Sequence, residues 1–234
     1  MSQASADFIR ANLKLEPVPS LPGVVLYTAH PGSRLSRLAA PDDAAPYWAW
    51  QWAGGLALAQ HLQAHPELVA GKRVLDLGAG SGLVGIVAAQ AGATVSAAEI
   101  DLNGRAAIAL NAEANGVALP LVDVDMLGEA PAGFDMIVGG DVFYLEDVAR
   151  RMLPFLERCV AAGIDVLIGD PGRRDLPIER LTELAAYAVG DVGDTRSSPD
   201  RRGTVYRLLA RLRGEPNSSS ASLAWALADH PPWP

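Results

Sequence analysis

Cysteine is almost absent from this sequence, and long apolar runs are missing altogether. Cys159 is the single cysteine among 234 residues, so no disulfide can form within the chain, as is typical of a reducing compartment. It stands in an apolar helical pattern, and we expect it in the core. Without a run of about 18 apolar residues, no membrane association is expected. The first residues also lack the basic start and apolar stretch of a signal peptide, so we expect a cytoplasmic protein.

Positive charge is scarce as well. The chain has 19 Lys and Arg residues against 27 Asp and Glu residues, which gives a formal net charge of −8. An acidic surface repels phosphate backbones, so no nucleic-acid partner is expected, and the paired arginines are interpreted as solvated faces. The four histidines are scattered and share no metal-ligand spacing with the cysteine, so no metal site is expected.

Composition and breaker residues divide the chain into one domain with an addition at each end. We expect an N-terminal extension over residues 1–46, a folded domain over residues 47–213 and a flexible tail over residues 214–234. In the extension, a short helix is expected over residues 4–15 and a strand over residues 24–28.

Within the domain, apolar runs alternate with helical patterns. Strands are expected at residues 73–77, 94–100, 119–124, 134–139, 164–169, 189–195 and 204–212. Helices are expected at residues 47–65, with an irregular aromatic start, and at 83–91, 104–115, 145–162 and 177–188. Such alternation gives right-handed crossovers and a mostly parallel sheet. Only a loop joins the last two strands, which should therefore pair antiparallel at the edge. We predict a Rossmann-like α/β fold of the class I methyltransferase type, with seven strands in the order 3-2-1-4-5-7-6 and strand seven antiparallel.

The strongest chemical signal is a glycine-rich loop directly after the first strand of the domain. Asp76 ends that strand, and Gly78, Gly80 and Gly82 follow at alternate positions before a helix. Glycine lets a ligand approach the backbone, and the helix N-terminus offers free N–H groups. These features suit the carboxylate of a methionyl group, with Asp76 facing its ammonium. The segment from Gly80 to Gly85 also matches the dinucleotide pattern G-x-G-x-x-G, but glycines that begin directly after the strand argue against a pyrophosphate site.

Acidic residues follow the next two strands as well. Glu99 is expected to accept both hydroxyls of a ribose, and Asp101 to cap the helix that follows. Asp125 is expected to accept from an adenine amino group, beside Met126, which would supply a backbone N–H and an apolar wall. An ordinary solvated loop acid is the alternative for Asp125.

Asp141 and Tyr144 follow the fourth strand, near the point where ligands of open α/β sheets gather. A target amine must lose its proton before it attacks, and a nearby carboxylate can orient it. The aromatic ring would form a wall facing a cation. The alternative is a capping Asp beside core aromatic residues.

Taken together, these segments resemble the seven-strand protein lysine methyltransferases of methyltransferase family 16, above all those acting on the β-subunit of electron transfer flavoprotein. The glycine loop is general to enzymes that use S-adenosylmethionine. More specific are Pro46–Gly55 (PYWAWQWAGG), Gly140–Tyr144 (GDVFY) and Val166–Arg173 (VLIGDPGR). The resemblance covers roughly residues 15–210.

The resemblance implies an enzyme that transfers a methyl group from S-adenosylmethionine to a protein lysine, with the β-subunit of electron transfer flavoprotein as the leading partner. It implies that Asp141 and Tyr144 border the lysine channel and that Trp52 lies near the cofactor. Glu99 stands where the family often has Asp, and the tail after Leu212 has no counterpart. Methylation of a ribosomal protein or of a small-molecule amine, and a cofactor-binding protein without catalysis, remain as alternatives.

Overall fold

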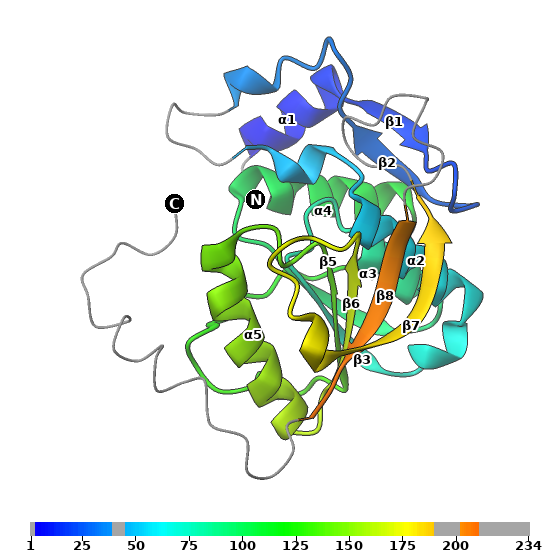
Figure 1. The fold of residues 1–234 in the computed structure, drawn as a ribbon. Coiled ribbons are helices and arrows are strands. Elements are labelled where there is room, and N and C mark those ends of the chain that lie inside the picture. The colour runs from blue at the N-terminus through cyan, green and yellow to red at the C-terminus, as the bar shows by residue number, and fades with distance from the viewer. Residues whose placement is uncertain (1–2, 39–44, 190–201, 211–234) are drawn as a thin grey trace.

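The computed structural model describes residues 3–38, 45–189 and 202–210 (Figure 1). The expected tail, residues 214–234, lies outside the described residues, as does nearly all of the strand expected at 189–195. Among the described residues, every helix is too short or too polar to cross a membrane. In that same part of the chain, no group of three or more His, Cys, Asp or Glu side chains is arranged to hold a metal ion.

A six-stranded sheet forms the centre of the molecule. Its strands are β3 (Arg73–Leu77), β4 (Thr94–Ala98), β5 (Met136–Gly140), β6 (Asp165–Asp170), β7 (Leu181–Ala188) and β8 (Arg202–Leu208). Their order is β4-β3-β5-β6-β8-β7, and β8 runs antiparallel to both of its neighbours while the other pairs are parallel. The predicted strand order and the antiparallel strand near the edge are therefore confirmed.

The predicted strand at residues 119–124 is wrong as a regular element. It is reduced to a single parallel bridge between Ala97 and Leu121, beside β4. The Ala97 N–H donates to the Pro120 carbonyl and the Val122 N–H donates to the Ala97 carbonyl, each at 2.9 Å. Pro120 has no N–H to offer a ladder, which limits pairing here to one register position.

The predicted helix at residues 177–188 is also wrong. The segment forms a single 3-10 turn, η4 (Ile178–Arg180), and then strand β7. Its Ala, Leu and Glu residues favour a helix, but β8 presents an open edge, and pairing along that edge overrides the propensity. The register shifts between Glu183 and Ala185, so Leu184 forms a bulge.

Helices cover both faces of the sheet. Those of the domain are α2 (Ala53–Ala64), α3 (Leu83–Gln90), α4 (Leu102–Ala114) and α5 (Glu146–Ala161), with η3 (Pro66–Leu68) following α2. Alternate strand residues face opposite ways: Val74 and Val138 pack with α2 and α3, whereas Leu75 and Ile137 pack with α5. Cys159 is fully buried on the α5 side, as predicted.

The N-terminal extension is fixed to the domain. It contains α1 (Gln3–Asn12), β1 (Lys14–Pro17), β2 (Val25–Thr28) and η1 (Leu35–Arg37), and η2 (Tyr47–Ala49) follows it. The predicted helix thus ends earlier than expected, and its last residues enter an antiparallel hairpin with β2. Figure 1 shows α1, β1 and β2 as a layer over α4, where Ile9 and Trp48 share an apolar cluster with Ala107.

Candidate active site

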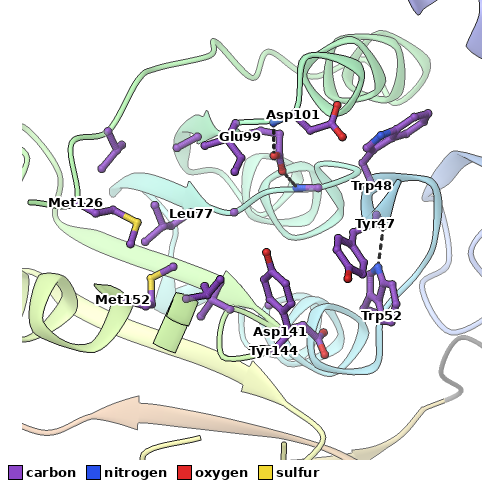
Figure 2. A pocket seen from close by; sticks show the side chains of 18 of the residues that line it. Tyr47, Trp48, Trp52, Leu77, Glu99, Asp101, Met126, Asp141, Tyr144 and Met152 are labelled. Carbon is purple, nitrogen blue, oxygen red and sulfur yellow. Dashed lines mark hydrogen bonds between the residues drawn. The ribbon is translucent and has the colours of Figure 1, made fainter. Parts of the chain in front are cut away.

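A cavity of about 550 Å³ opens at the carboxyl ends of β3, β4 and β5. It is lined by the glycine loop after β3, the acid that ends β4, the loop after the Leu121 bridge and the turn after β5. Aromatic residues from η2 and from the start of α2 close one side (Figure 2). Parallel strands end at a common edge, and this is why residues far apart in the sequence meet here.

Seven of the ten residues that the sequence nominated for the site line this cavity. They are Trp52, Gly78, Gly80, Glu99, Met126, Asp141 and Tyr144. The other three, Asp76, Gly82 and Asp125, are absent from the cavity wall, and each has a structural position of its own.

Glu99 spans the cavity wall between the glycine loop and α4. Its Oε2 accepts the Gly80 N–H at 2.8 Å and its Oε1 accepts the Asp101 N–H at 2.9 Å (Figure 2). Burial raises the pKa of Glu99, and the two backbone hydrogen bonds oppose that rise. Asp101 caps α4 as predicted, since its side chain accepts from the N–H groups of Asn103 and Gly104.

Asp76 lies behind the glycine loop and is not among the residues that line the cavity, so its expected contact with an ammonium group stays a prediction. It is 1% exposed, and its Oδ2 accepts the Gly85 N–H of α3 at 2.8 Å. Burial raises its pKa to about 7. Gly82 is the residue before α3 and has φ of 82°. A Cβ at this position would lie 3.4 Å from the side chain of Ile108. Both residues shape the loop from behind.

Asp125 occupies a turn, which is the structural alternative that the sequence left open. Its Oδ1 accepts the Leu127 N–H at 2.9 Å, and the residue is exposed. Met126 lines the cavity as an apolar wall, while its carbonyl accepts Nη2 of Arg158 at 2.6 Å. The acid that reaches the cavity from this loop is Asp123, which pairs with Arg105 at 2.7 Å.

Apolar side chains form the section of the cavity beside Met126. They are Leu77, Ala98, Ile100, Val122 and Val124. Across from them, Trp48 lines the cavity and is only 2% exposed, yet its indole N–H has no hydrogen-bond partner among the residues that the structure describes. An apolar slot, an acid and an unpartnered buried donor together form a set suited to a nucleoside-like group.

Asp141 lies at the other end of the cavity, in the turn after β5. Its φ of 57° is unusual for a non-glycine residue, and its N–H donates to the Gly169 carbonyl at 2.8 Å. Its Oδ1 accepts Nε and Nη2 of Arg173 at 3.1 and 2.5 Å, and its Oδ2 accepts the Gly55 N–H at 2.9 Å. The carboxylate is therefore held by hydrogen bonds from an arginine on one side and from the first turn of α2 on the other.

Three aromatic rings gather beside Asp141 (Figure 2). The ring centroid of Tyr47 lies 5.5 Å from that of Trp52 and 5.3 Å from that of Tyr144. The Trp52 indole donates to the Tyr47 carbonyl at 2.7 Å, which fixes its orientation. Burial raises the pKa of Tyr144, so its hydroxyl stays protonated. Such a cluster can hold a cation or the aliphatic stem of a lysine.

Sequence reasoning missed Tyr47, Trp48 and Arg173 as site residues. The two aromatic residues stand in the segment that carried the family resemblance, and Arg173 ends the other segment, IGDPGR. The signal that could have identified them is their position within the two segments that carry the family resemblance. The sequence does not show where these side chains point, because that depends on how η2 and the loop after β6 fold over the sheet edge.

Comparison with known proteins agrees with this geometry. Residues 53–141 match the family described as Methyltransferase small domain. Relatives from Rattus norvegicus and Danio rerio, both named electron transfer flavoprotein beta subunit lysine methyltransferase, are 44% and 46% identical over 151 and 153 residues. Each alignment covers 62% of this chain but only 59% of the relative's own length.

A more complete match comes from Mus musculus. Its protein N-lysine methyltransferase METTL21A is 32% identical over 172 residues, which cover 70% of this chain and 78% of that protein. This chain belongs to the protein N-lysine methyltransferase family. Among solved structures, a ribosomal protein L11 methylase from Lactobacillus delbrueckii subsp. bulgaricus matches with a TM-score of 0.47 and 22% identity, over 66% of this chain and 77% of that chain. Nothing about the substrate follows from so distant a likeness.

S-adenosylmethionine is the cofactor of this methyltransferase domain, and the cavity described above fits it. Gly78 and Gly80 have φ of 66° and 54° and present backbone without side chains at the cavity wall. The apolar slot, Glu99 and the unpartnered indole of Trp48 supply an aromatic-ring site, an acceptor and a donor.

Proposed function

We propose that this chain is an S-adenosylmethionine-dependent protein-lysine N-methyltransferase whose substrate is the β-subunit of electron transfer flavoprotein. The observation that carries the activity is one continuous cavity with a glycine loop and an acid at one end and Asp141 among three aromatic rings at the other. Identity of 44–46% to relatives that bear this substrate in their names supports the choice of partner.

In the cofactor half of the cavity, each wall has a separate task. The backbone of Gly78 and Gly80 would face the methionyl part, and Glu99 would accept from the ribose hydroxyls. The slot beside Met126 would take the adenine ring, and the apolar surface of the slot would be removed from water on binding. The bound cofactor supplies a methyl carbon on a positively charged sulfur, and that carbon is the electrophile.

In the acceptor half, the chain positions a lysine amine. Tyr47, Trp52 and Tyr144 form a wall for the aliphatic stem, and Asp141 accepts a hydrogen bond from the nitrogen. With the cofactor bound, its sulfonium sulfur would act as the leaving group when the amine takes the methyl carbon. The contribution of the chain would be to position the amine against that carbon, and positioning of this kind can supply much of a rate gain.

A macromolecular substrate suits the charge of the chain and its open acceptor end. The net charge of −8 attracts a basic, lysine-bearing surface, and this attraction weakens as salt rises. Tyr144 and Leu145, at the rim of the cavity, are 38% and 52% exposed, so apolar surface is available to a docked protein.

The test is to incubate the protein with labelled S-adenosylmethionine and purified electron transfer flavoprotein, and in parallel with an extract from cells that lack the gene. Mass spectrometry then locates the label. We expect label on a lysine of the β-subunit. Label on a ribosomal protein alone would replace the partner but keep the chemistry, and label on small molecules alone would refute a protein substrate.

A further inference from the structure

A carboxylate beside the acceptor nitrogen creates an electrostatic problem. An opposite charge within about 4–6 Å favours the charged form of an amine, so Asp141 alone would hold the lysine as an ammonium. An ammonium has no lone pair for the methyl carbon. The site therefore needs a way to keep the hydrogen-bond acceptor while cancelling its charge.

Arg173 stands in the position to do this. Two of its N–H groups converge on Oδ1 of Asp141, at 3.1 and 2.5 Å, and its guanidinium lies 5.7 Å from the Trp52 ring centroid. Asp141 is 8% exposed and the Arg173 side chain 23% exposed, so solvent screens the pair weakly. The first turn of α2 adds partial positive charge through the Gly55 N–H, at 2.9 Å from Oδ2.

The loop that carries Arg173 is built to hold it there. Asp170 ends β6 with 0% exposure, and its Oδ1 accepts the N–H groups of Gly172 and Arg173, both at 2.7 Å. Gly172 has φ of 88°, which lets the chain turn back toward the cavity. A short, side-chain-braced turn fixes the arginine more firmly than a free surface loop would.

We propose that Arg173 is a positioning residue for the methyl acceptor, which holds the Asp141 carboxylate in place and cancels its charge so that the bound lysine sheds its proton. The inference rests on the proposed lysine methyltransferase activity. The ammonium releases one proton to water before attack. The neutral nitrogen then gives its lone pair to the new N–C bond, the electron pair of the C–S bond stays with sulfur, and the methylated product is again an ammonium that keeps its two remaining protons.

Other charged and titratable groups also face the acceptor end. Among the described residues, Tyr144 in the turn after β5 and Tyr47 of η2 line it, and Asp170 at the end of β6 lies behind it and interacts electrostatically with Asp141. Glu99 lines the other end of the cavity, and Arg174, Asp175 and Glu146 are ion-paired at the surface outside. Burial raises the pKa of Asp170 to about 6. Arg173 lines the cavity and contacts Asp141 directly.

The experiment measures kcat against pH, from about 6 to 10, with purified electron transfer flavoprotein as the acceptor. Because kcat reports the bound complex, its rising limb follows loss of the amine proton. In Arg173→Gln the carboxylate loses the positive charge of this arginine, so the rising limb moves up by about one pH unit and the deficit in kcat shrinks at high pH. Asp141→Asn removes the negative charge beside the amine, so its rising limb moves down although kcat falls.

Two variants serve as controls. Arg173→Lys keeps the charge but loses the two-pronged contact, so kcat falls while the limb stays in place. Arg174→Gln alters the exposed residue next to Arg173 and leaves both kcat and the rising limb unchanged. Calorimetry with S-adenosylhomocysteine checks that each variant keeps the cofactor half intact. If Arg173→Gln binds S-adenosylhomocysteine poorly, the downward shift of the rising limb in Asp141→Asn decides whether the charge of Asp141 controls the lysine proton.

Two results overturn the inference in distinguishable ways. If the unaltered chain methylates lysine but Arg173→Gln loses the same fraction of kcat at every pH, or Asp141→Asn shows no downward shift, Arg173 has only a structural role. If the unaltered chain gives no lysine product, the proposed function fails, and the inference fails with it.

Discussion

Three buried aspartates at the edge of the sheet have different roles because their hydrogen-bond and ion-pair partners differ. Asp76, Asp141 and Asp170 end strands or begin turns on the same edge of the sheet, and all are less than 9% exposed. Asp76 accepts the Gly85 N–H and has no ion pair within the described part of the chain, whereas Asp141 is paired with Arg173. Asp170 braces the turn that delivers Arg173. One residue type at one edge thus shapes a loop, lines the cavity and positions a neighbour.

Asp76 makes the stability of the protein depend on pH. Its pKa is raised by burial from 3.8 to about 7, so the proton is held more tightly in the folded state. The stabilisation of the folded state by this bound proton is complete below about pH 4 and is lost as pH rises toward 7. Asp76→Asn keeps an acceptor for the Gly85 N–H without a charge. We expect it to raise the free energy of unfolding at pH 8, by an amount on the order of 1–3 kcal/mol.

Urea unfolding at about pH 5.5 and pH 8 measures this difference. The gain from Asp76→Asn should be clearly larger at pH 8. Asp123→Asn is the control, because that carboxylate is 87% exposed and its burial changes little on folding. An equal gain at both pH values would show that Asp76 is not the source of the effect.

At the scale of elements, the placement of α2 depends on backbone that lacks side chains. A Cβ on Gly169 would lie 2.0 Å from the Gly54 carbonyl oxygen, and one on Gly140 would lie 2.5 Å from the Gly55 Cα. The helix thus rests directly on the ends of β5 and β6. This close approach brings the Gly55 N–H to Asp141 and places Trp52 at the cavity.

Gly169→Ala should push α2 off the sheet. Backbone atoms cannot give way as a flexible side chain would, so we expect a loss of about 1–3 kcal/mol or more in the free energy of unfolding. Weaker binding of S-adenosylhomocysteine should accompany it as Trp52 moves. Gly55→Ala is the matched control, since a Cβ there meets nothing within 4 Å and a helical Gly→Ala change gains up to about 1 kcal/mol. Denaturant unfolding and calorimetry would contradict the interpretation if the two variants behaved alike.

The same comparison of elements explains what the sequence could predict. Residues 73–77 and the glycine loop were located correctly, because a continuous apolar run and alternate glycines leave few alternatives. Residues 177–188 were not, because local propensity favours a helix and pairing with β8 outweighs it. Within the site, Glu99, Asp141 and Tyr144 follow from their position at strand ends. Arg173 does not, since its direction depends on the turn braced by Asp170.

At the scale of the whole molecule, the N-terminal layer and the cofactor loop are joined through α4. Asn111 is fully buried, and its Nδ2 donates to the Ser81 carbonyl at 2.8 Å while its Oδ1 accepts the Tyr27 N–H at 2.8 Å. One turn further along α4, Asn115 pairs with both the N–H and the carbonyl of Val25. The extension is thereby anchored to the same helix that supports the glycine loop.

Asn111→Ala should affect both stability and cofactor binding. It leaves the Ser81 carbonyl and the Tyr27 N–H without their partner, at a cost of about 1–3 kcal/mol for each. We expect a lower free energy of unfolding and weaker binding of S-adenosylhomocysteine. Asn115→Ala should lower stability without changing affinity, because Asn115 contacts β2 but not the loop. Calorimetry on both variants tests this; equal affinities would show that the layer and the loop are independent.

The sequence by itself determined the class of fold and the chemistry of the cofactor loop. Periodic apolar runs, a strand-ending acid and alternate glycines are local features, and local sterics and burial fix what they form. Tertiary structure alone decided which acids face the cavity, since Asp76 turns to α3 and Asp125 turns to its own loop. It also decided that Arg173 meets Asp141 across 32 residues. Such pairings depend on how separate strands end at one edge, and that arrangement is a property of the packed sheet rather than of any segment within it.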